Sequence, residues 1–570
     1  MENEIAGTAA EAEAIEDEEP TDPSDPDGPL VLGPMLRYVD ATSATIWVET
    51  DRPGTVEVLG ASSHTFTVAG HHYALVVVDG LEPASMIEYD VRLDGEVVWP
   101  DPDSELPPSV IRTFDPDRDV SILFGSCRAA APHEPPYTLE LANDDDGRGI
   151  DTLWAHARRM LGEAPEDWPT LLLLIGDQIY ADDSSPSTQE RIKASRPDDS
   201  DLPPSIVGTF EEYCWLYAEA WSKRLERWLL SVVPSVMIFD DHDMIDSWNI
   251  SQSWRDDHRQ LDWWSEHAIG GYMSYWIYQH LGNLSPSALR EETLLTRVAE
   301  SDDGTEVLRS WAAATDSVQP GEATYRFSFA RAVGDVKVVV IDSRNNRVFD
   351  GERRIVGADE WGWVREQALD HPGHVLLGTT LPVFLPDGLH DLHTWNVGVC
   401  EGKWGKRFAK LGEKIRREID LDDWPAFAAS YADMIALIED LDALADPPGT
   451  VVIVAGDIHF SFSARLPYGT GRTRAHQVVS SPIRNALIPY ERGAMRFTLT
   501  RTGAVIGSVL RRLVRGPRTA PHFELTSGPY FANNMCELRY AGDDVELVVE
   551  HATPDDDGKP QLAVVADLSL

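Results

Sequence analysis

Four apolar segments run directly into side chains that can bind metal ions, and this pattern constrains the chain most. The segments 120–124, 171–175, 236–239 and 451–455 are short and almost wholly apolar, which is typical of buried parallel strands. They continue into Gly-Ser-Cys-Arg at 125–128, Gly-Asp-Gln-Ile-Tyr-Ala-Asp at 176–182, Asp-Asp-His-Asp at 240–243 and Gly-Asp-Ile-His at 456–459. Ligands collect at the carboxyl ends of strands in open α/β sheets. The four endings therefore indicate a metal-dependent hydrolase.

The net charge of the chain limits the classes of partner that it can bind. The formal net charge is −48, and only eight of the basic residues are lysines. A field of that sign repels nucleic acid and anionic membranes unless a local arginine cluster reverses it. No segment approaches the 18 uninterrupted apolar residues of a membrane span. We therefore expect a small-molecule partner, no nucleic acid and no membrane span.

Cysteine usage and the N-terminal sequence bear on the compartment. Cys127, Cys214, Cys400 and Cys536 are widely spaced and form no CxxC pair, which excludes a disulfide scaffold and a zinc ribbon. Residues 1–28 are acidic and carry neither a basic region, an apolar core nor a twin-arginine pair. They are expected to form a disordered acidic tail rather than an export signal, and the protein is expected to be cytoplasmic.

The periodicity predicts three further regions. Residues 29–115 contain short alternating strands separated by turn signals, which favours a β-sandwich of the immunoglobulin or fibronectin-III kind. From 116 to 520 strands alternate with helices, as in an α/β catalytic domain, and 521–570 return to strands as a C-terminal β extension packed on it. Within the catalytic region, Thr209 is the expected N-cap of a helical pattern reaching Leu230, and residues 390–396 are expected in a loop at the site rim.

The residue types at the strand ends suit a two-metal site. Two cations about 3.5–4 Å apart polarise a phosphoryl oxygen, and one carboxylate usually bridges them. Asp177 is the expected bridge, and Tyr180 three residues later can turn back to the same centre. Cys127 offers a thiolate, which suits iron or zinc rather than magnesium or calcium. Each residue also has a structural alternative: a buried small side chain for the cysteine, a turn for Gly-Asp, and a solvated loop for the acidic stretch.

Two more strand endings add ligands and a proton donor. Asp457 and His459 stand two residues apart on an extended segment, so both side chains are expected on one face. Asp241 and His242 offer a carboxylate and an imidazole that can protonate a leaving oxygen. Arg128 is the nearest cation for a substrate phosphate, with a structural ion pair as its alternative role.

In order and spacing, the four motifs resemble the alkaline phosphatase D family of the metallophosphatase superfamily. The resemblance covers about residues 119–490 and implies a four-layer α/β/β/α domain behind an N-terminal sandwich. Cys127, Asp241 and Asp457 stand where ordinary metallophosphatases have histidine or asparagine ligands, which implies iron together with calcium, or another divalent metal. By the same resemblance, iron would bind Cys127, Asp177, Tyr180 and His459. Calcium would bind Asp177, Asp457 and Asp246, the last in place of the family's usual asparagine.

The resemblance implies a phosphoric monoester hydrolase in which metal-bound hydroxide attacks phosphorus and His242 protonates the leaving oxygen. Three alternatives stay open. The same site would serve phosphodiesters. A non-catalytic protein could bind a partner and keep a vestigial metal site. A glycoside hydrolase would also be rich in carboxylates, but the mixture of Cys, Tyr and His ligands disfavours it.

Overall fold

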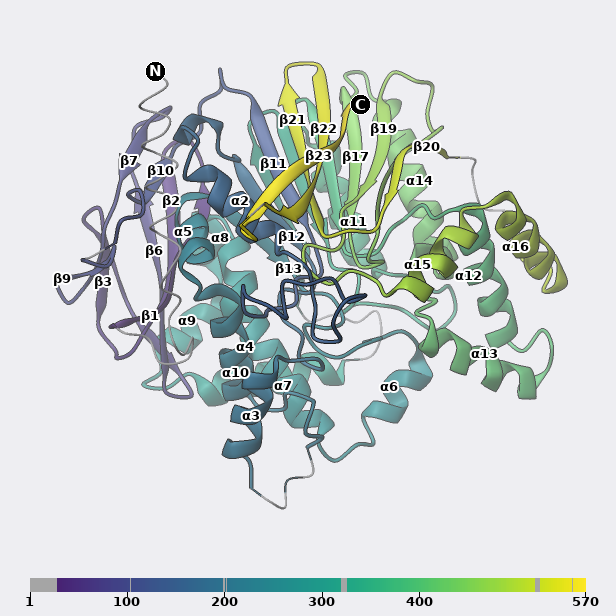
Figure 1. The fold of residues 1–570 in the computed structure, drawn as a ribbon, viewed down its shortest axis with the longest axis horizontal. Helices are drawn as coiled ribbons and strands as arrows, with labels where there is room; N and C mark the ends of the chain where they lie inside the picture. Colours follow the sequence, from purple (N-terminus) through teal and green to yellow (C-terminus); the bar gives the residue numbers. More distant parts are fainter. Residues whose placement is uncertain are drawn as a thin grey trace.

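A computed structural model describes residues 28–102, 104–197, 200, 202–318, 325–517, 523–555 and 557–570. Two large mixed β-sheets stand side by side at the centre of the molecule, with the N-terminal strands along one side and helices around the outside (Figure 1). The expected acidic tail, residues 1–28, lies outside the described residues except for Gly28.

The N-terminal strands form a sandwich, as the sequence predicted. One sheet has the order β1-β2-β6-β5 and the other β4-β3-β8-β9, with β10 and β7 as a separate pair. Inward-facing side chains such as Ile46 and Val76 form a core of their own. The strands are β1 (Leu30–Val39), β2 (Ser43–Thr50), β3 (Thr55–Val58), β4 (Ala61–His64), β5 (Phe66–Val68), β6 (His71–Asp79), β7 (Met86–Glu88), β8 (Val91–Leu93), β9 (Glu96–Trp99) and β10 (Val110–Arg112).

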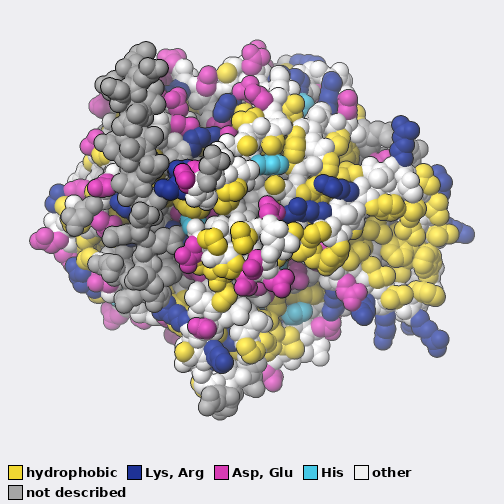
Figure 2. Space-filling model, in the orientation of Figure 1, with side chains coloured by type: hydrophobic (Ala, Val, Ile, Leu, Met, Phe, Trp, Pro, Cys, Tyr) yellow, Lys and Arg dark blue, Asp and Glu magenta, His cyan; other side chains and the backbone are white. Residues whose placement is uncertain are grey.

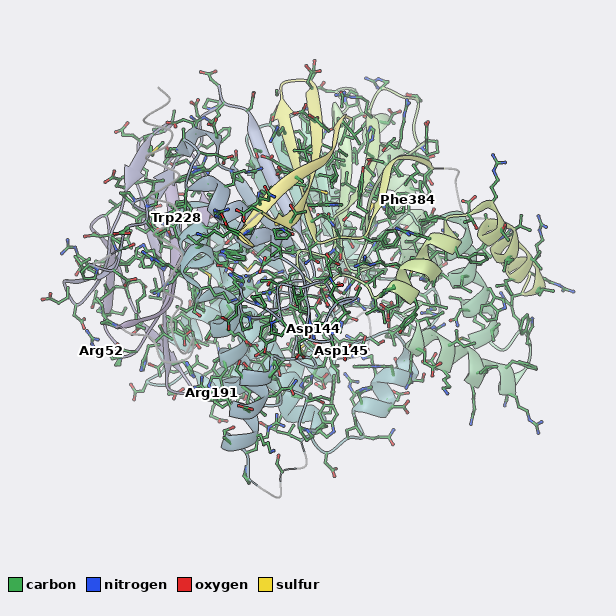
Figure 3. The ribbon with its side chains drawn as sticks, in the orientation of Figure 1. Arg52, Asp144, Asp145, Arg191, Trp228 and Phe384 are labelled. Carbon is green, nitrogen blue, oxygen red and sulfur yellow. The ribbon has the colours of Figure 1, made fainter. Side chains whose placement is uncertain are left out.

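Buried polar contacts fix this sandwich to the rest of the chain. The Arg37 guanidinium on β1 donates to the carbonyls of Tyr278 (2.8 Å) and Gln279 (2.7 Å). Trp228, labelled in Figure 3, is fully buried beside the sandwich and donates its indole N–H to the carbonyl of Pro107 at 2.9 Å. Because such groups are buried only when paired, the two parts are joined by a specific interface.

The first central sheet has the order β13-β12-β11-β21-β22-β23. Strands β11, β12 and β13 are parallel neighbours, so their carboxyl ends meet at one edge, and β21–β23 continue the sheet in antiparallel fashion. The bounds are β11 (Val120–Gly125), β12 (Leu171–Ile175), β13 (Ser235–Ile238), β21 (Asn534–Ala541), β22 (Asp544–Pro554) and β23 (Pro560–Ser569).

The second central sheet has the order β14-β15-β16-β17-β19-β18-β20. Alternate residues separate cleanly: Val452 and Val454 pack in the core shared with the first sheet, whereas Val451 and Ile453 pack in a second core with helical residues such as Leu437. This period of two places one face against the first sheet and the other against helices, which gives the four layers expected. The bounds are β14 (Phe329–Val333), β15 (Val336–Ile341), β16 (His374–Thr379), β17 (Thr450–Ala455), β18 (Ser461–Arg465), β19 (Arg474–Val479) and β20 (Glu524–Tyr530).

The helices surround the two sheets (Figure 1). They are α2 (Thr152–Met160), α3 (Pro186–Ser195), α4 (Phe210–Trp221), α5 (Arg224–Val232), α6 (Gln252–His258), α7 (Trp264–Ser274), α8 (Pro286–Glu291), α9 (Thr293–Ala299), α10 (Thr305–Ser317), α11 (Ala358–Leu369), α12 (Asp387–Cys400), α13 (Lys406–Glu418), α14 (Ala428–Asp442), α15 (Pro489–Thr498) and α16 (Arg501–Leu513). Short turns η1 (Pro165–Asp167), η2 (Tyr275–His280), η3 (Leu281–Asn283) and η4 (Trp424–Ala426) link some of them. Helices α2 and α11 pack against the sheets, whereas α12, α13, α15 and α16 pack on one another at the right-hand side of the molecule (Figure 1).

Two local expectations meet different outcomes. Thr209 is the N-cap of α4, where it forms a capping box with Glu212, but the helical pattern is interrupted at Ser222 and resumes as α5. The prediction of a rim loop at 390–396 is wrong. These residues lie within α12, and this helix is stabilised by packing against α16 and α13. Within the part of the chain that the structure describes, no helix is long and apolar enough to span a membrane.

The two sheets touch where β11 and β17 end. A Cβ atom added to Gly456, which follows β17, would lie 2.1 Å from Ser126 Oγ and 2.4 Å from Ser126 Cβ. Ser126 immediately follows β11, and its hydroxyl accepts the N–H of Asp457 at 3.2 Å. Glycine is therefore required for this close approach.

We predict that Gly456→Ala lowers the free energy of unfolding by about 1–3 kcal/mol, because the added methyl group must separate the two sheets. Urea denaturation followed by circular dichroism measures the change. Gly362→Ala is the matched control: Gly362 is exposed within α11 and has nothing within 4 Å of an added Cβ. That variant should gain up to about 1 kcal/mol of helix stability. Equal midpoints for Gly456→Ala and wild type would contradict the close contact.

Candidate metal centre

The loops after four strands converge at the junction of the two sheets. Cys127 follows β11, Asp177 follows β12, Asp240 and Asp241 follow β13, and Asp457 and His459 follow β17. Hydrogen bonds join these loops: the N–H of Cys127 donates to the Gly176 carbonyl at 3.2 Å, and the N–H of Arg128 donates to the Asp177 carbonyl at 3.0 Å. The N–H of Asp457 donates to Ser126 Oγ at 3.2 Å, so residues more than 300 positions apart are held at one place.

The candidate ligands share an unusual backbone conformation. Cys127, Asp177, Asp457 and His459 have φ angles of 59°, 48°, 65° and 54°. Left-handed φ costs a residue with a Cβ atom roughly 1–2 kcal/mol, and such strain concentrates at functional sites. Four strained residues at one junction indicate that the fold holds these side chains in place for a purpose beyond stability.

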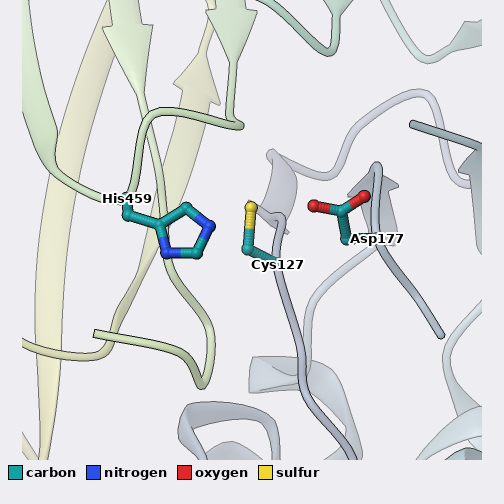
Figure 4. Close-up of side chains that lie close together, drawn as sticks. All are labelled: Cys127, Asp177 and His459. Carbon is teal, nitrogen blue, oxygen red and sulfur yellow. The ribbon is translucent and has the colours of Figure 1, made fainter. Parts of the chain in front are cut away.

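A first ligand cluster contains a thiol, a carboxylate and an imidazole. One ligand atom from each of Cys127, Asp177 and His459 lies within 4.8 Å of the others, and the sulfur of Cys127 stands between the imidazole and the carboxylate (Figure 4). Tyr180 is buried beside them, and burial followed by the charges of Cys127 and Asp177 raises its pKa. The structure thus brings together the four residues expected around iron.

A second cluster consists of carboxylates alone. Oxygen atoms of Asp177, Asp240, Asp241 and Asp457 lie within 4.8 Å of one another. Asp177 belongs to both clusters, the position that a bridging ligand would take. Both of its carboxylate oxygens are buried and lack a hydrogen-bond partner among the described residues. Such a group is costly in the fold unless a cation binds it.

The sequence analysis assigned no role to Asp240. Asp240 and Asp241 are adjacent after the same strand, so the sequence does not show which of the two faces the site. Asp243, the last acid of the same motif, accepts the N–H groups of both Asp177 and Asp240 at 2.9 Å. Burial is the main cause that raises its pKa to about 7. Asp243 therefore positions the backbone of two loops rather than facing a ligand.

Burial sets the protonation of the cluster. It is the largest cause that raises the pKa of Asp177, Asp457 and Cys127, and neighbouring carboxylates add to it. Burial, followed by the charge of His242, lowers the pKa of His459 to about 4. His459 Nδ1 donates to the Asn485 carbonyl at 2.7 Å, so its Nε2 is unprotonated and free to bind a metal.

Arg344, which sequence reasoning missed, supplies a cation to the second cluster. It follows β15, and its guanidinium is paired with Asp422 at 2.8 Å, with Asp241 and Asp457 at 3.1 Å each, and with Asp240. Burial alone would lower its pKa, but the carboxylates raise it. The available sequence signal was an arginine after the apolar strand 336–341, the same pattern as at the other strand ends.

His242 has the surroundings of a proton donor. Its Nδ1 donates to Asp182 Oδ1 at 2.8 Å, and its ring lies 4.6 Å from that of Tyr180. Burial alone would lower the pKa of His242, but Asp182, Asp177 and Asp241 raise it well above its usual value. The second ring nitrogen of this cation thus carries a proton that it can donate.

Two expected site residues are outside the two ligand clusters. Arg128 is 2 % exposed and donates to Asp151 at 2.9 Å, to Glu226 at 2.9 Å and to the Ala220 carbonyl at 2.6 Å. This geometry favours the structural ion pair that the sequence left open over contact with a phosphate. Asp246 is outside both clusters, although loss of water around its carboxyl and the charge of Asp241 raise its pKa to about 6. Its role as a calcium ligand stays a prediction.

The ligand set fits metal ions. A thiol, a phenol and a neutral imidazole suit iron or zinc, whereas a group of carboxylates suits a hard cation such as calcium. The partnerless oxygens of Asp177, between the two groups, complete this fit.

Comparisons with known proteins add the following. A family model described as PhoD-like phosphatase matches residues 152–504, and one described as a domain of unknown function (DUF7800) matches residues 27–111. No curated protein sequence matches significantly. Among solved structures, one titled "Structure of PhoD" is similar with a TM-score of 0.56 and 14 % identity, covering 96 % of this chain and 91 % of that chain. The structure of purple acid phosphatase PPD1 from yellow lupin (Lupinus luteus) seeds has a TM-score of 0.47 and 11 % identity, covering 95 % of this chain and 74 % of that chain. The first likeness shows a shared fold.

Arg128→Met should lower the free energy of unfolding by about 3–5 kcal/mol, because it leaves the buried carboxylates of Asp151 and Glu226 without their cation. Arg148→Met is the control, because the ion pair of Arg148 with the exposed Asp183 is long, at 3.8 Å, and its loss should cost little. Chemical denaturation measures both. Wild-type stability with weakened phosphate binding would instead support the substrate role.

Arg344→Ala should lower the stability of the metal-free protein by about 3–5 kcal/mol, since the carboxylates that it neutralises stay buried. Calcium should restore part of the loss, because a divalent cation can bind the same oxygens. Removal of the exposed pair in Arg365→Ala should cost below about 1 kcal/mol and respond little to calcium. Thermal unfolding with and without calcium tests this, and an unaltered midpoint for Arg344→Ala would show that the guanidinium is not needed there.

Proposed function

The chain belongs to the PhoD-like phosphatase family, and from this premise we propose that it hydrolyses phosphoric monoesters at the junction of the two sheets. The observation that carries the proposal is Asp177, whose two buried, partnerless oxygens belong to both ligand clusters. The family is one of metallophosphatases, so divalent metal ions are the expected cofactors.

We assign the metals by donor chemistry. Iron fits Cys127, Asp177, Tyr180 and His459, because thiolate, phenolate and imidazole are ligands that iron accepts. Calcium fits Asp177, Asp241 and Asp457, with Asp240 in the same cluster and Asp246 as the expected additional ligand. When bound, these cations would polarise a phosphoryl oxygen and lower the pKa of water.

The remaining steps depend on groups of the chain. Water adds to phosphorus while the bond from phosphorus to the leaving oxygen breaks. His242, held by Asp182, donates its proton to that departing oxygen. Arg344 opposes the rise that burial causes in the pKa of Asp240 and Asp457, and it orients both carboxylates, since its guanidinium contacts both. The buried walls around Cys127 and Asp177 exclude bulk water, which strengthens the electrostatic interactions in the site.

We predict that Asp177→Asn loses at least about 100-fold in kcat/KM on an aryl phosphate, because even partners of metal ligands cost 10- to 100-fold when removed. Metal content measured by mass spectrometry should fall in the same variant. Its metal-free stability should not fall, because the carboxylate that is lost has no partner among the described residues. Initial rates on matched aryl mono- and diesters decide whether the monoester is the preferred substrate.

Asp183→Asn is the matched control, since the side chain of Asp183 is 59 % exposed and lies six residues further along the chain. It should retain wild-type rates and metal content. Wild-type turnover by the Asp177→Asn protein would show that the proposed mechanism is wrong.

A further inference from the structure

Helix α16 presents its large apolar side chains to solvent. Val505, Ile506, Val509 and Leu513 are 63 %, 46 %, 47 % and 58 % exposed, whereas Gly503 and Gly507 face the protein. These four apolar residues recur at helical spacing and form one stripe. An ordinary surface helix has the opposite arrangement, with the apolar stripe buried.

Close packing against α12 fixes this orientation. A Cβ atom added to Gly507 would lie 2.8 Å from the carbonyl oxygen of Gly388, and one added to Gly388 would lie 3.0 Å from the backbone of Gly503. No larger side chain fits between the two helices. The apolar residues of α16 are therefore held outward by the fold and are not free to rotate into it.

Neighbouring helices extend the exposed apolar surface. Trp404 joins α13 to α16, because its indole N–H donates to the Leu513 carbonyl at 3.3 Å and its ring contacts Phe408. We call the combined surface the outer face. Its exposed apolar members are Phe408 and Leu411 on α13, Ile419 just after it, Tyr490 and Phe497 on α15, and the stripe on α16.

The outer face is basic in an otherwise acidic chain. Four of the eight lysines, Lys403, Lys406, Lys410 and Lys414, fall within twelve residues at α13. Residues 490–517 contain six arginines and one acid, whereas the whole chain has 48 basic and 96 acidic residues. In Figure 2 the apolar surface fills the right-hand side of the molecule, and Lys and Arg side chains project around its edge.

Apolar side chains ringed by lysine and arginine match the surface of an anionic membrane. Such a face inserts its apolar residues at the boundary between headgroups and acyl chains, while each basic residue near the surface adds attraction to anionic lipid. A second copy of the chain fits less well, because pairing two outer faces would bring their basic residues together. A protein rarely exposes many neighbouring apolar side chains to water unless a partner covers them.

We propose that the outer face docks the protein on membrane surfaces that contain anionic lipid, a property beyond the proposed hydrolase activity and independent of it. Docking here would place the bilayer close to the candidate metal centre. The Asn485 carbonyl accepts from His459, and α15 begins only four residues later. Those four residues span at most about 14 Å.

Flotation of the full-length protein with vesicles tests the proposal. The probes are vesicles of phosphatidylcholine alone and of phosphatidylcholine with 30 % phosphatidylglycerol, each at low salt and at 0.5 M salt. We expect binding to the anionic vesicles at least about tenfold stronger than to the zwitterionic ones, and weakened by salt because exposed charges are screened.

Two variants divide the contributions. The triple variant Val505→Ser, Ile506→Ser, Val509→Ser should weaken binding at least about tenfold, as should Lys406→Glu, Arg407→Glu, Lys410→Glu. Both alter exposed side chains, so thermal midpoints and hydrolysis of a soluble aryl phosphate should stay at wild-type values. The matched control is Val564→Ser, Val565→Ser on β23, where the two valines are 59 % and 37 % exposed outside the outer face.

Three results would overturn the proposal. The first is wild-type protein that fails to bind anionic vesicles at low salt. The second is undiminished binding by the two triple variants with intact folds. The third is a concentration-dependent dimer, seen by light scattering, that the serine variant abolishes while no vesicle binding occurs. That last result would assign the outer face to a second copy of the chain.

Discussion

The burial of several carboxylates at the junction of the two sheets is the constraint on which the rest of the site depends. Oxygen atoms of Asp177, Asp240, Asp241 and Asp457 lie within 4.8 Å of one another, and Cys127 adds a further acidic group. Burial and mutual repulsion make their charged forms costly. Arg344 contributes a guanidinium, and both oxygens of Asp177 lack a hydrogen-bond partner among the described residues. This excess of carboxylates supports the proposal that the junction binds metal ions.

A second group of buried charges provides a comparison. Arg128 meets Asp151 and Glu226, and its donors are satisfied by those carboxylates and a carbonyl. Burial opposes the ionised state of Glu226, but the charge and hydrogen bond of His133, followed by the charge of Arg128, lower its pKa to about 2. In this second group Arg128 pairs with both carboxylates and His133 lies beside them, whereas both oxygens of Asp177 lack a hydrogen-bond partner among the described residues. The paired ions therefore serve the fold, and the oxygens of Asp177 are available to a ligand.

Charge is also distributed unevenly over the whole molecule. The net charge of −48 would by itself repel anionic surfaces, yet the helices α13, α15 and α16 gather lysine and arginine around exposed apolar side chains. Because salt screens exposed charges within about 10 Å, the local cluster governs what approaches that face, while the distant acids contribute little. Net charge and local charge therefore predict different partners for different faces of one protein.

The sequence alone determined the fold class, the family and the identity of the strand-end motifs. Apolar strands and the residues that follow them are local features, so they can be recognised from the order of residues alone. The partners in an ion pair are residues that are often distant in the sequence. Only the tertiary structure therefore showed that Arg344 pairs with the acids of the site and Arg128 with Asp151. It also decided the left-handed backbone of the ligands and the helical state of residues 390–396. The outward face of α16 likewise depends on a glycine contact with α12, more than a hundred residues away along the chain.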